Sequence, residues 1–228
     1  MKALVIKVIK FIAHHFADGY IYKEQSLVNQ YVNRSKTQTL DYIDENMNGT
    51  LFFHDLEKLW DFTISQIDNT NEGNIFEFGV FKGRSINYFS NKLNLISFFG
   101  FDSFDGLKED WIGTSLPKGH FALNKTPKVN LNVSLIKGWF NETLPLFLDK
   151  FSGKLKLIHI DCDTYESTYY VLNELKQRQM LDKGVMILFD EYFGYPGFKV
   201  GEMKAFKEVS IPYKYLAFSN KQVLCKII

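Results

Sequence analysis

The chain has 228 residues, of which 46% are hydrophobic and 23% charged, as is typical of a soluble globular domain with at most a modest extension. Its 27 Lys and Arg residues nearly balance its 26 Asp and Glu residues, so a net charge of +1 gives no general attraction to nucleic acid or to anionic membranes. No uninterrupted apolar run reaches the roughly 18 residues of a membrane span. The two cysteines, Cys162 and Cys225, fit a reduced protein, which we expect to be cytoplasmic.

The first segment of the chain predicts an amphipathic helix. Apolar residues recur at helical spacing from Leu4 to Phe16, while Lys7 and Lys10 lie on the opposite face, and the helix should end near Gly19. The lysines inside the apolar run and the lack of a small-residue cleavage site argue against a signal peptide. We expect this helix to pack on the domain or on a second subunit, and in the second case the protein would form a homo-oligomer.

Two regimes follow along the chain. Residues 1–72 are expected to form a polar, helical N-terminal extension, and residues 73–228 a separate domain. In that domain, strands are predicted at 74–79, 96–102, 133–138, 155–160 and 185–189, and helices at 85–93, 142–151, 165–180 and 201–209. The alternation predicts a parallel sheet with helices on both faces, and the pair "YKYLAF" and "QVLCKII" predicts a closing antiparallel hairpin.

A glycine loop, "FEFGVFKGRS", joins the first strand of this domain to its helix. Gly79 and Gly83 permit a tight turn and a close approach of the backbone to a ligand. A dinucleotide-binding loop would carry a second glycine where Phe81 stands, and Glu77 would repel a pyrophosphate. The loop therefore favours a cationic or hydroxyl-rich ligand.

An acid at the end of the second strand extends this hypothesis. Asp102 lies 19 residues after Gly83, a place where an acid commonly accepts hydrogen bonds from both hydroxyls of a ribose. An adenosine with a positively charged amino-acid tail would suit Asp102 and Glu77 together. S-adenosylmethionine is such a ligand.

Five motifs in order now resemble a known family: "FEFGVFKGRSINYF", "GFDSFDGLKEDW", "KGWFNETLP", "IHIDCDTYEST" and "FDEYFGYPGF". Over residues 72–228 the chain resembles the macrocin O-methyltransferase group of class I S-adenosylmethionine-dependent methyltransferases. The resemblance implies a Rossmann-like α/β fold with a seven-stranded sheet in the order 3-2-1-4-5-7-6, mostly parallel with strand 7 antiparallel. It also implies a cofactor across the carboxyl ends of the strands, where α/β sheets generally bind ligands.

The resemblance implies roles for single residues as well. Members of this group methylate sugar hydroxyls in antibiotics and related glycosides, and characterised members use magnesium, so the implied partner is a small sugar or glycoside acceptor. The cofactor's methionine end would be lined by Glu77, Gly79, Phe81, Gly83 and Ser85, its ribose held by Asp102 and Ser103 with Phe104 beside it, and its adenine placed near Gly138 and Trp139.

Acidic residues end two neighbouring predicted strands. Asp161, Asp190 and Glu191 should converge at the carboxyl ends of these strands, where their oxygens suit Mg²⁺. Coordination would lower the high pKa of a sugar hydroxyl and orient its oxygen, and Asp161 or Asp163 could take the proton. The matching family positions usually read Asp, then Asp-Asp, so the longer side chain of Glu191 would change the geometry of the metal site.

Several alternatives stay open. "DTYE" resembles a capping box, so Asp163 could cap the following helix together with Glu166 instead of acting as a base. The leading function is Mg²⁺-assisted O-methylation of a sugar hydroxyl, in a natural product or a surface polysaccharide precursor. A methyltransferase acting on a non-sugar hydroxyl and a catalytically silent cofactor-fold binding protein are the alternatives, although the latter has no need of the acids. A nicotinamide dehydrogenase is disfavoured by Phe81.

Overall fold

The structure is a computed structural model that describes residues 5–13 and 26–228. Residues 5–13 are helical, as predicted, but the expected end of this helix near Gly19 lies outside the described residues. None of the described helices is long and apolar enough to cross a membrane. The remaining elements are α2 (Leu27–Asn46), β1 (Leu51–Phe52), α3 (Leu56–Ser65), β2 (Asn74–Phe78), α4 (Arg84–Lys92), β3 (Ser97–Asp102), β4 (Val133–Lys137), α5 (Phe140–Leu148), β5 (Leu155–Ile160), α6 (Tyr165–Gln177), β6 (Met186–Phe189), the 3-10 turn η1 (Phe198–Val200), α7 (Glu202–Val209), β7 (Tyr213–Ser219) and β8 (Gln222–Ile227).

The sheet has eight strands in the order β1-β7-β8-β6-β5-β2-β3-β4, which corrects the expected count of seven. The seven long strands keep the implied order, and β8 is antiparallel to both β6 and β7. The additional strand, β1, pairs in parallel with β7. It has two residues, Leu51 and Phe52, whose exposed side chains leave no alternating pattern by which the sequence could reveal it.

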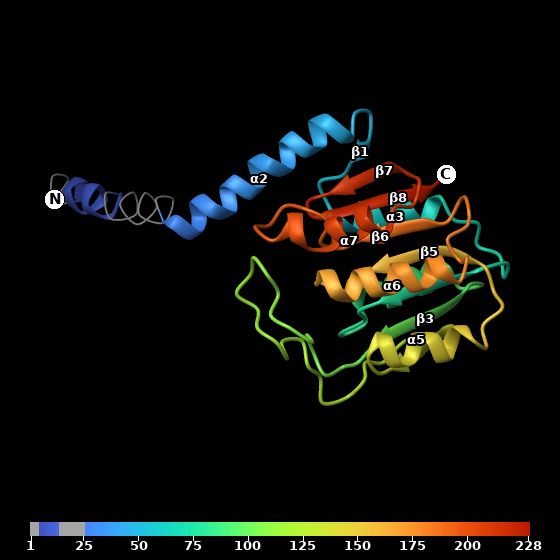
Figure 1. The fold of residues 1–228 in the computed structure, drawn as a ribbon. Helices are drawn as coiled ribbons and strands as arrows, with labels where there is room; N and C mark the ends of the chain where they lie inside the picture. Colours follow the sequence, from blue (N-terminus) through green and yellow to red (C-terminus); the bar gives the residue numbers. More distant parts are fainter. Residues whose placement is uncertain (1–4, 14–25) are drawn as a thin grey trace.

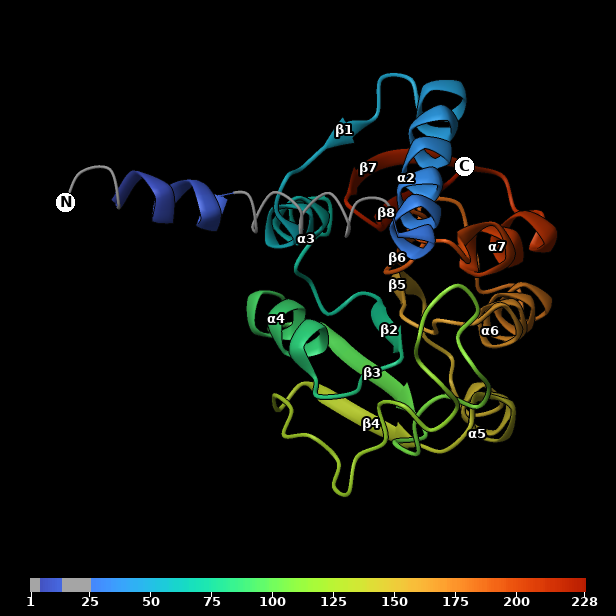
Figure 2. The same cartoon turned by 90° about the vertical axis from the view of Figure 1, so that its left-hand side faces the viewer.

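Helices cover both faces of the sheet, α3 and α4 on one and α5, α6 and α7 on the other (Figure 2). The strands are therefore apolar at successive positions, because alternate side chains enter opposite cores. Phe76 and Phe78 of β2 pack toward α5–α7, for example, whereas Ile75 packs on the side of α3 and α4. This arrangement uses many of the chain's 22 phenylalanines as core.

Part of the predicted N-terminal extension belongs to the body of the molecule. Helix α3 packs Leu59 and Trp60 into the core on its face of the sheet. Helix α2 is attached near its carboxyl end, where Tyr42 contacts Tyr215 and where Gly194 N donates to Thr39 Oγ1 at 3.0 Å. Its amino-terminal end projects away from the sheet (Figure 1), and a domain boundary at residue 72 stays a prediction.

The functional edge of the sheet follows from its topology. Strands β2, β3, β5 and β6 are neighbours with parallel pairing, so their carboxyl ends lie at one edge. The long loop between β3 and β4, residues 103–132, lies at this edge (Figure 1). An open α/β sheet offers its ligand site at this edge.

Candidate active site

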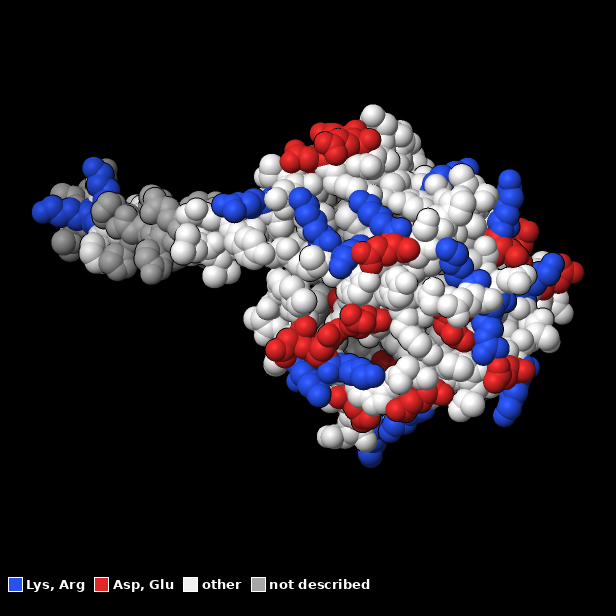
Figure 3. Space-filling view, in the orientation of Figure 1, with Lys and Arg blue, Asp and Glu red and all other residues white. Residues whose placement is uncertain are grey.

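A cavity of about 430 Å³ lies at the carboxyl ends of the strands. Figure 3 shows acidic atoms inside a hollow of this side of the molecule, with acidic and basic side chains around it. Its volume is in the range of small-molecule sites. Ten of the predicted site residues line it: Gly79, Phe81, Asp102, Ser103, Gly138, Trp139, Asp161, Asp163, Asp190 and Glu191.

Four predicted cofactor residues lie outside the cavity lining. The Glu77 carboxylate is buried in β2, where it lies 2.9 Å from His159 Nδ1 and accepts a hydrogen bond from Ser85 Oγ at 2.9 Å. Gly83 precedes α4 with a φ of 76°, and Phe104 is buried in the core. Burial opposes a charge on His159, but Glu77 outweighs this effect and raises the pKa of the imidazole. The cofactor roles of these four residues stay predictions.

Asp102 joins the two loops that form one wall of the cavity. Its Oδ2 accepts hydrogen bonds from Val80 N at 2.8 Å and Phe81 N at 2.7 Å, and its Oδ1 accepts one from Phe104 N at 2.7 Å. The carboxylate therefore orders the glycine loop as well as facing the cavity. Ser103 Oγ accepts from Asp105 N at 3.1 Å and supports the same turn.

Gly79 brings the glycine loop against the acidic segment after β5. Its φ is 92°, and a Cβ built on it would lie 1.8 Å from the carbonyl oxygen of Asp161. A side chain therefore cannot be accommodated at residue 79 without moving the backbone at Asp161. The glycine is required by this close approach within the protein itself.

Aromatic side chains form another wall of the cavity. The ring of Phe81 lies edge-on to Phe121, 5.1 Å between centroids, and Trp111 contacts Phe121 from the long loop. At the end of β4, Trp139 lines the cavity with Lys108 Nζ 5.7 Å from its ring centroid. Flat apolar walls of this kind suit a purine ring or the face of a sugar.

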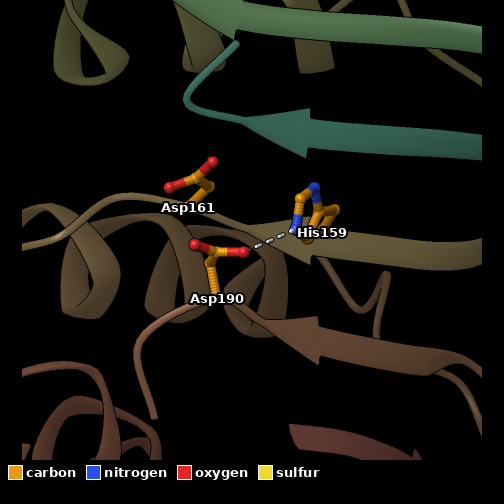
Figure 4. A group of neighbouring side chains, drawn as sticks. All are labelled: His159, Asp161 and Asp190. Carbon is orange, nitrogen blue, oxygen red and sulfur yellow. Dashed lines mark ion pairs between the residues drawn. The ribbon is translucent and has the colours of Figure 1, made fainter. Parts of the chain in front are cut away.

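The acids converge at the ends of β5 and β6, which are adjacent and parallel. Possible ligand atoms of Asp161, Asp163 and Glu191 lie within 4.8 Å of one another, and so do those of His159, Asp161 and Asp190. Figure 4 shows the second group, in which His159 Nε2 lies 4.0 Å from Asp190 Oδ1. Asp161 belongs to both groups, whereas Asp190 and Glu191 fall in different ones, and His159 was not among the predicted ligands.

Burial and mutual repulsion act on the carboxyl groups of this cluster. Burial, followed by repulsion from Asp190, raises the pKa of Asp161 and Glu191 well above the usual range and that of Asp163 to about 7. Among the described residues, Glu191 Oε2 is buried with no hydrogen-bond partner. Lys221 Nζ lies 3.7 Å from Glu191 Oε1. Closely spaced carboxylate oxygens with unused acceptor capacity fit Mg²⁺, which prefers oxygen ligands.

Asp163 does not cap helix α6, which corrects the capping-box reading. The N-cap is Thr164, whose side chain accepts a hydrogen bond from Ser167 N. Asp163 lies one residue earlier with a φ of 63°, a left-handed conformation that is uncommon for a residue other than glycine. Its side chain is nine-tenths buried and lines the cavity. Asp163 therefore faces the cavity and is not the cap of α6, and its catalytic role stays a prediction.

Side chains from distant segments support the acids. Gln222 Nε2 of β8 donates to Asp190 Oδ1, and Gln222 Oε1 accepts from Trp60 Nε1 of α3 at 2.9 Å. Glu202, the first residue of α7, accepts hydrogen bonds from Cys162 N and Glu191 N. The sequence gives no local signal for these contacts, because the residues are 32 and 11 positions from their partners at Asp190 and Glu191.

Comparison with known proteins assigns the family. The model of the methyltransferase domain family matches residues 76–192, about half of the chain, and this range carries the glycine loop, Asp102 and all four acids. The chain belongs to the methyltransferase domain family. A search of curated proteins by sequence found no match to this methyltransferase.

Two solved structures share the fold of this methyltransferase. CalS11, a calicheamicin methyltransferase, is 23% identical, with a TM-score of 0.61 over 89% of this chain and 93% of that chain. An apo structure of CalS11, described as a TDP-rhamnose 3'-O-methyltransferase of calicheamicin biosynthesis, is 25% identical, with a TM-score of 0.52 over 75% and 76% of the two chains. The predicted fold class and the prediction of a methyltransferase are confirmed, whereas the narrower macrocin group stays a prediction.

Proposed function

We propose that the chain is an S-adenosylmethionine-dependent O-methyltransferase that acts, with the help of Mg²⁺, on a hydroxyl of a small sugar or glycoside. The observation that carries the proposal is the cluster of Asp161, Asp163, Asp190 and Glu191 on a cavity that the glycine loop also lines. A domain that only bound a cofactor would gain nothing from four crowded carboxylates, two of them buried, since holding such charges together away from water is costly. The likeness to CalS11, a sugar O-methyltransferase, supports a sugar acceptor.

The cofactor would lie along the ends of β2, β3 and β4. Asp102 and Ser103 would receive the ribose hydroxyls, and Trp139 and Gly138 would flank the adenine. Phe81 and Gly79 border the part of the cavity next to Asp161, where the methionine end would point toward the acids. When bound, S-adenosylmethionine supplies a methyl group on a positively charged sulfur.

The acids would prepare the acceptor. Asp161, Asp190 and Glu191 would hold Mg²⁺, which supplies a Lewis acid that lowers the pKa of an acceptor hydroxyl. Asp163 would accept the hydroxyl proton on its carboxylate, because its side chain lines the cavity next to Asp161 and Glu191 and a base must lie within reach of the proton that it takes. The walls of the cavity would keep acceptor and cofactor in line and exclude water.

The proposal is tested by measuring methyl transfer from S-adenosylmethionine to a panel of glycosides and nucleotide-activated sugars, with non-sugar hydroxyl compounds alongside. We expect turnover with a sugar, loss of turnover in excess EDTA, and unchanged S-adenosylmethionine binding in calorimetry. Asp161→Asn should abolish turnover, whereas Asp182→Asn, an exposed acid between α6 and β6, should not. Binding without turnover on any acceptor would favour a silent binding protein, and full activity in EDTA would remove the metal from the proposal.

A further inference from the structure

Glu202 is a charged residue in an unexpected place. It is the first residue of α7, yet its side chain is fully buried, at 0% exposure. Its Oε1 accepts a hydrogen bond from Cys162 N at 3.3 Å, and its Oε2 accepts one from Glu191 N at 3.2 Å. One carboxylate therefore holds two backbone groups from different segments.

Both segments carry the acids of the site. Cys162 stands between Asp161 and Asp163, and Glu191 is itself one of the candidate metal ligands. The pairing of β5 with β6 ends at Ile160 and Phe189, followed by a hydrogen bond from Asp190 N to Ile160 O at 2.9 Å. Beyond this point, Glu202 links the two segments.

The usual role of an acid in the first turn of a helix does not explain this arrangement. Such acids interact favourably with the helix dipole while remaining at the surface. Glu202 instead turns its carboxylate to amides outside its own helix, and burial of that carboxylate costs free energy unless its partners compensate. The two amides that it holds account for its position.

We propose that Glu202 is a positioning residue that fixes the distance between the segment that carries Asp161 and the segment that carries Glu191, so that these two acids can share one divalent cation. This inference rests on the proposed function. A glutamine of the same size could not replace it, because its amide has one acceptor oxygen and would turn N–H groups toward one of the two backbone amides. Mutation of a residue that orients metal ligands without touching the metal commonly lowers metal affinity by about 10- to 100-fold.

The test compares Glu202→Gln with Val209→Ala in the full chain. Val209 is buried at the other end of α7, so its truncation should weaken the packing of the same helix without reaching the acids. We expect Glu202→Gln to lower Mg²⁺ affinity in calorimetry by about tenfold or more and to leave S-adenosylmethionine affinity within about twofold. Hydrogen exchange followed by mass spectrometry should quicken in peptides that contain Cys162 and Glu191. Val209→Ala should show neither change.

A merely structural role predicts a different result. If Glu202→Gln lowers the melting temperature as Val209→Ala does, with unchanged Mg²⁺ affinity and exchange, the inference is overturned. If Glu202→Gln does not fold, Glu202→Asp decides, because its shorter side chain cannot reach both amides and should show the same losses in smaller measure. If the unaltered chain binds no Mg²⁺, the proposed metal site fails, and exchange at the two peptides still decides whether Glu202 links the segments.

Discussion

At Gly79 of the glycine loop, the protein itself as well as the predicted ligand limits which side chain can be accommodated. The sequence pattern suggests that a side chain at Gly79 would invade the space of the cofactor's methionine tail. The structure gives a different cause, because the nearest atom to a built Cβ is the Asp161 carbonyl oxygen at 1.8 Å. A substitution at residue 79 therefore disturbs the acidic segment directly.

Gly79→Ala is expected to lower the free energy of unfolding by about 2 kcal/mol or more and to weaken Mg²⁺ binding, because Asp161 must move. The matched control is Gly184→Ala. Gly184 has a similar φ of 100° with no atom within 4 Å of a built Cβ, so it bears the conformational cost alone. Urea unfolding and Mg²⁺ calorimetry measure both effects. Equal losses in the two variants would show that the contact with Asp161 has no consequence.

Asp102 combines a structural role with a predicted binding role. Asp102→Ala removes the acceptor of three backbone N–H groups, and we expect a loss of about 2 kcal/mol in stability together with weaker S-adenosylmethionine binding. Asp102→Asn keeps one acceptor oxygen and should retain more of both. Chemical unfolding and calorimetry separate the two roles. Lower stability with an unchanged dissociation constant would leave the carboxylate as a loop support alone.

At the scale of elements, the sequence predicts the strands and helices, which have periodic apolar patterns, but not the contacts between residues that are distant along the chain. The strands and helices of residues 74–228 lie within a few residues of their predicted bounds, because alternating apolar runs and turn residues are local signals. The order of the acids along the chain likewise predicts their meeting at one edge. The capping of α6 by Thr164 and the burial of Glu77 against His159 depend on tertiary contacts, which no local pattern contains.

Two hydrogen bonds connect helix α3 to the acids: Trp60 Nε1 donates to Gln222, and Gln222 donates to Asp190. Trp60→Phe keeps most of the buried ring but removes the N–H donor to Gln222 Oε1. We expect a stability loss of about 1 kcal/mol and a Mg²⁺ affinity a few-fold lower, because Gln222 can then turn away from Asp190. Tyr88→Phe is the control, since it removes a hydrogen bond to Asp61 beside the same tryptophan. Identical Mg²⁺ affinity in both variants would show that the hydrogen bond from Trp60 of α3 does not affect the metal site.

At the scale of the whole molecule, the buried acids couple stability to pH and to the cation. In the unfolded chain an aspartate titrates near pH 4, whereas burial, followed by repulsion from Asp190, raises the pKa of Asp163 to about 7 in the fold. The folded chain therefore binds more protons than the unfolded chain between these values. The stability that the Asp163 carboxyl contributes to the fold is fully present below about pH 4 and is lost as the pH rises toward 7. Asp161 and Glu191, whose pKa values are raised well above normal, act in the same direction.

A divalent cation should reverse this loss, because it binds the ionised carboxylates and offsets their repulsion. We expect the melting temperature of the chelator-treated chain to fall between pH 5 and pH 8, and the increase produced by Mg²⁺ to be several degrees larger at pH 8 than at pH 5. Asp163→Asn should flatten the decline, since an amide does not titrate. Differential scanning calorimetry of the unaltered chain and this variant, with and without Mg²⁺, measures these melting temperatures at each pH. A Mg²⁺ effect of equal size at both pH values would show that the cation does not bind at these acids.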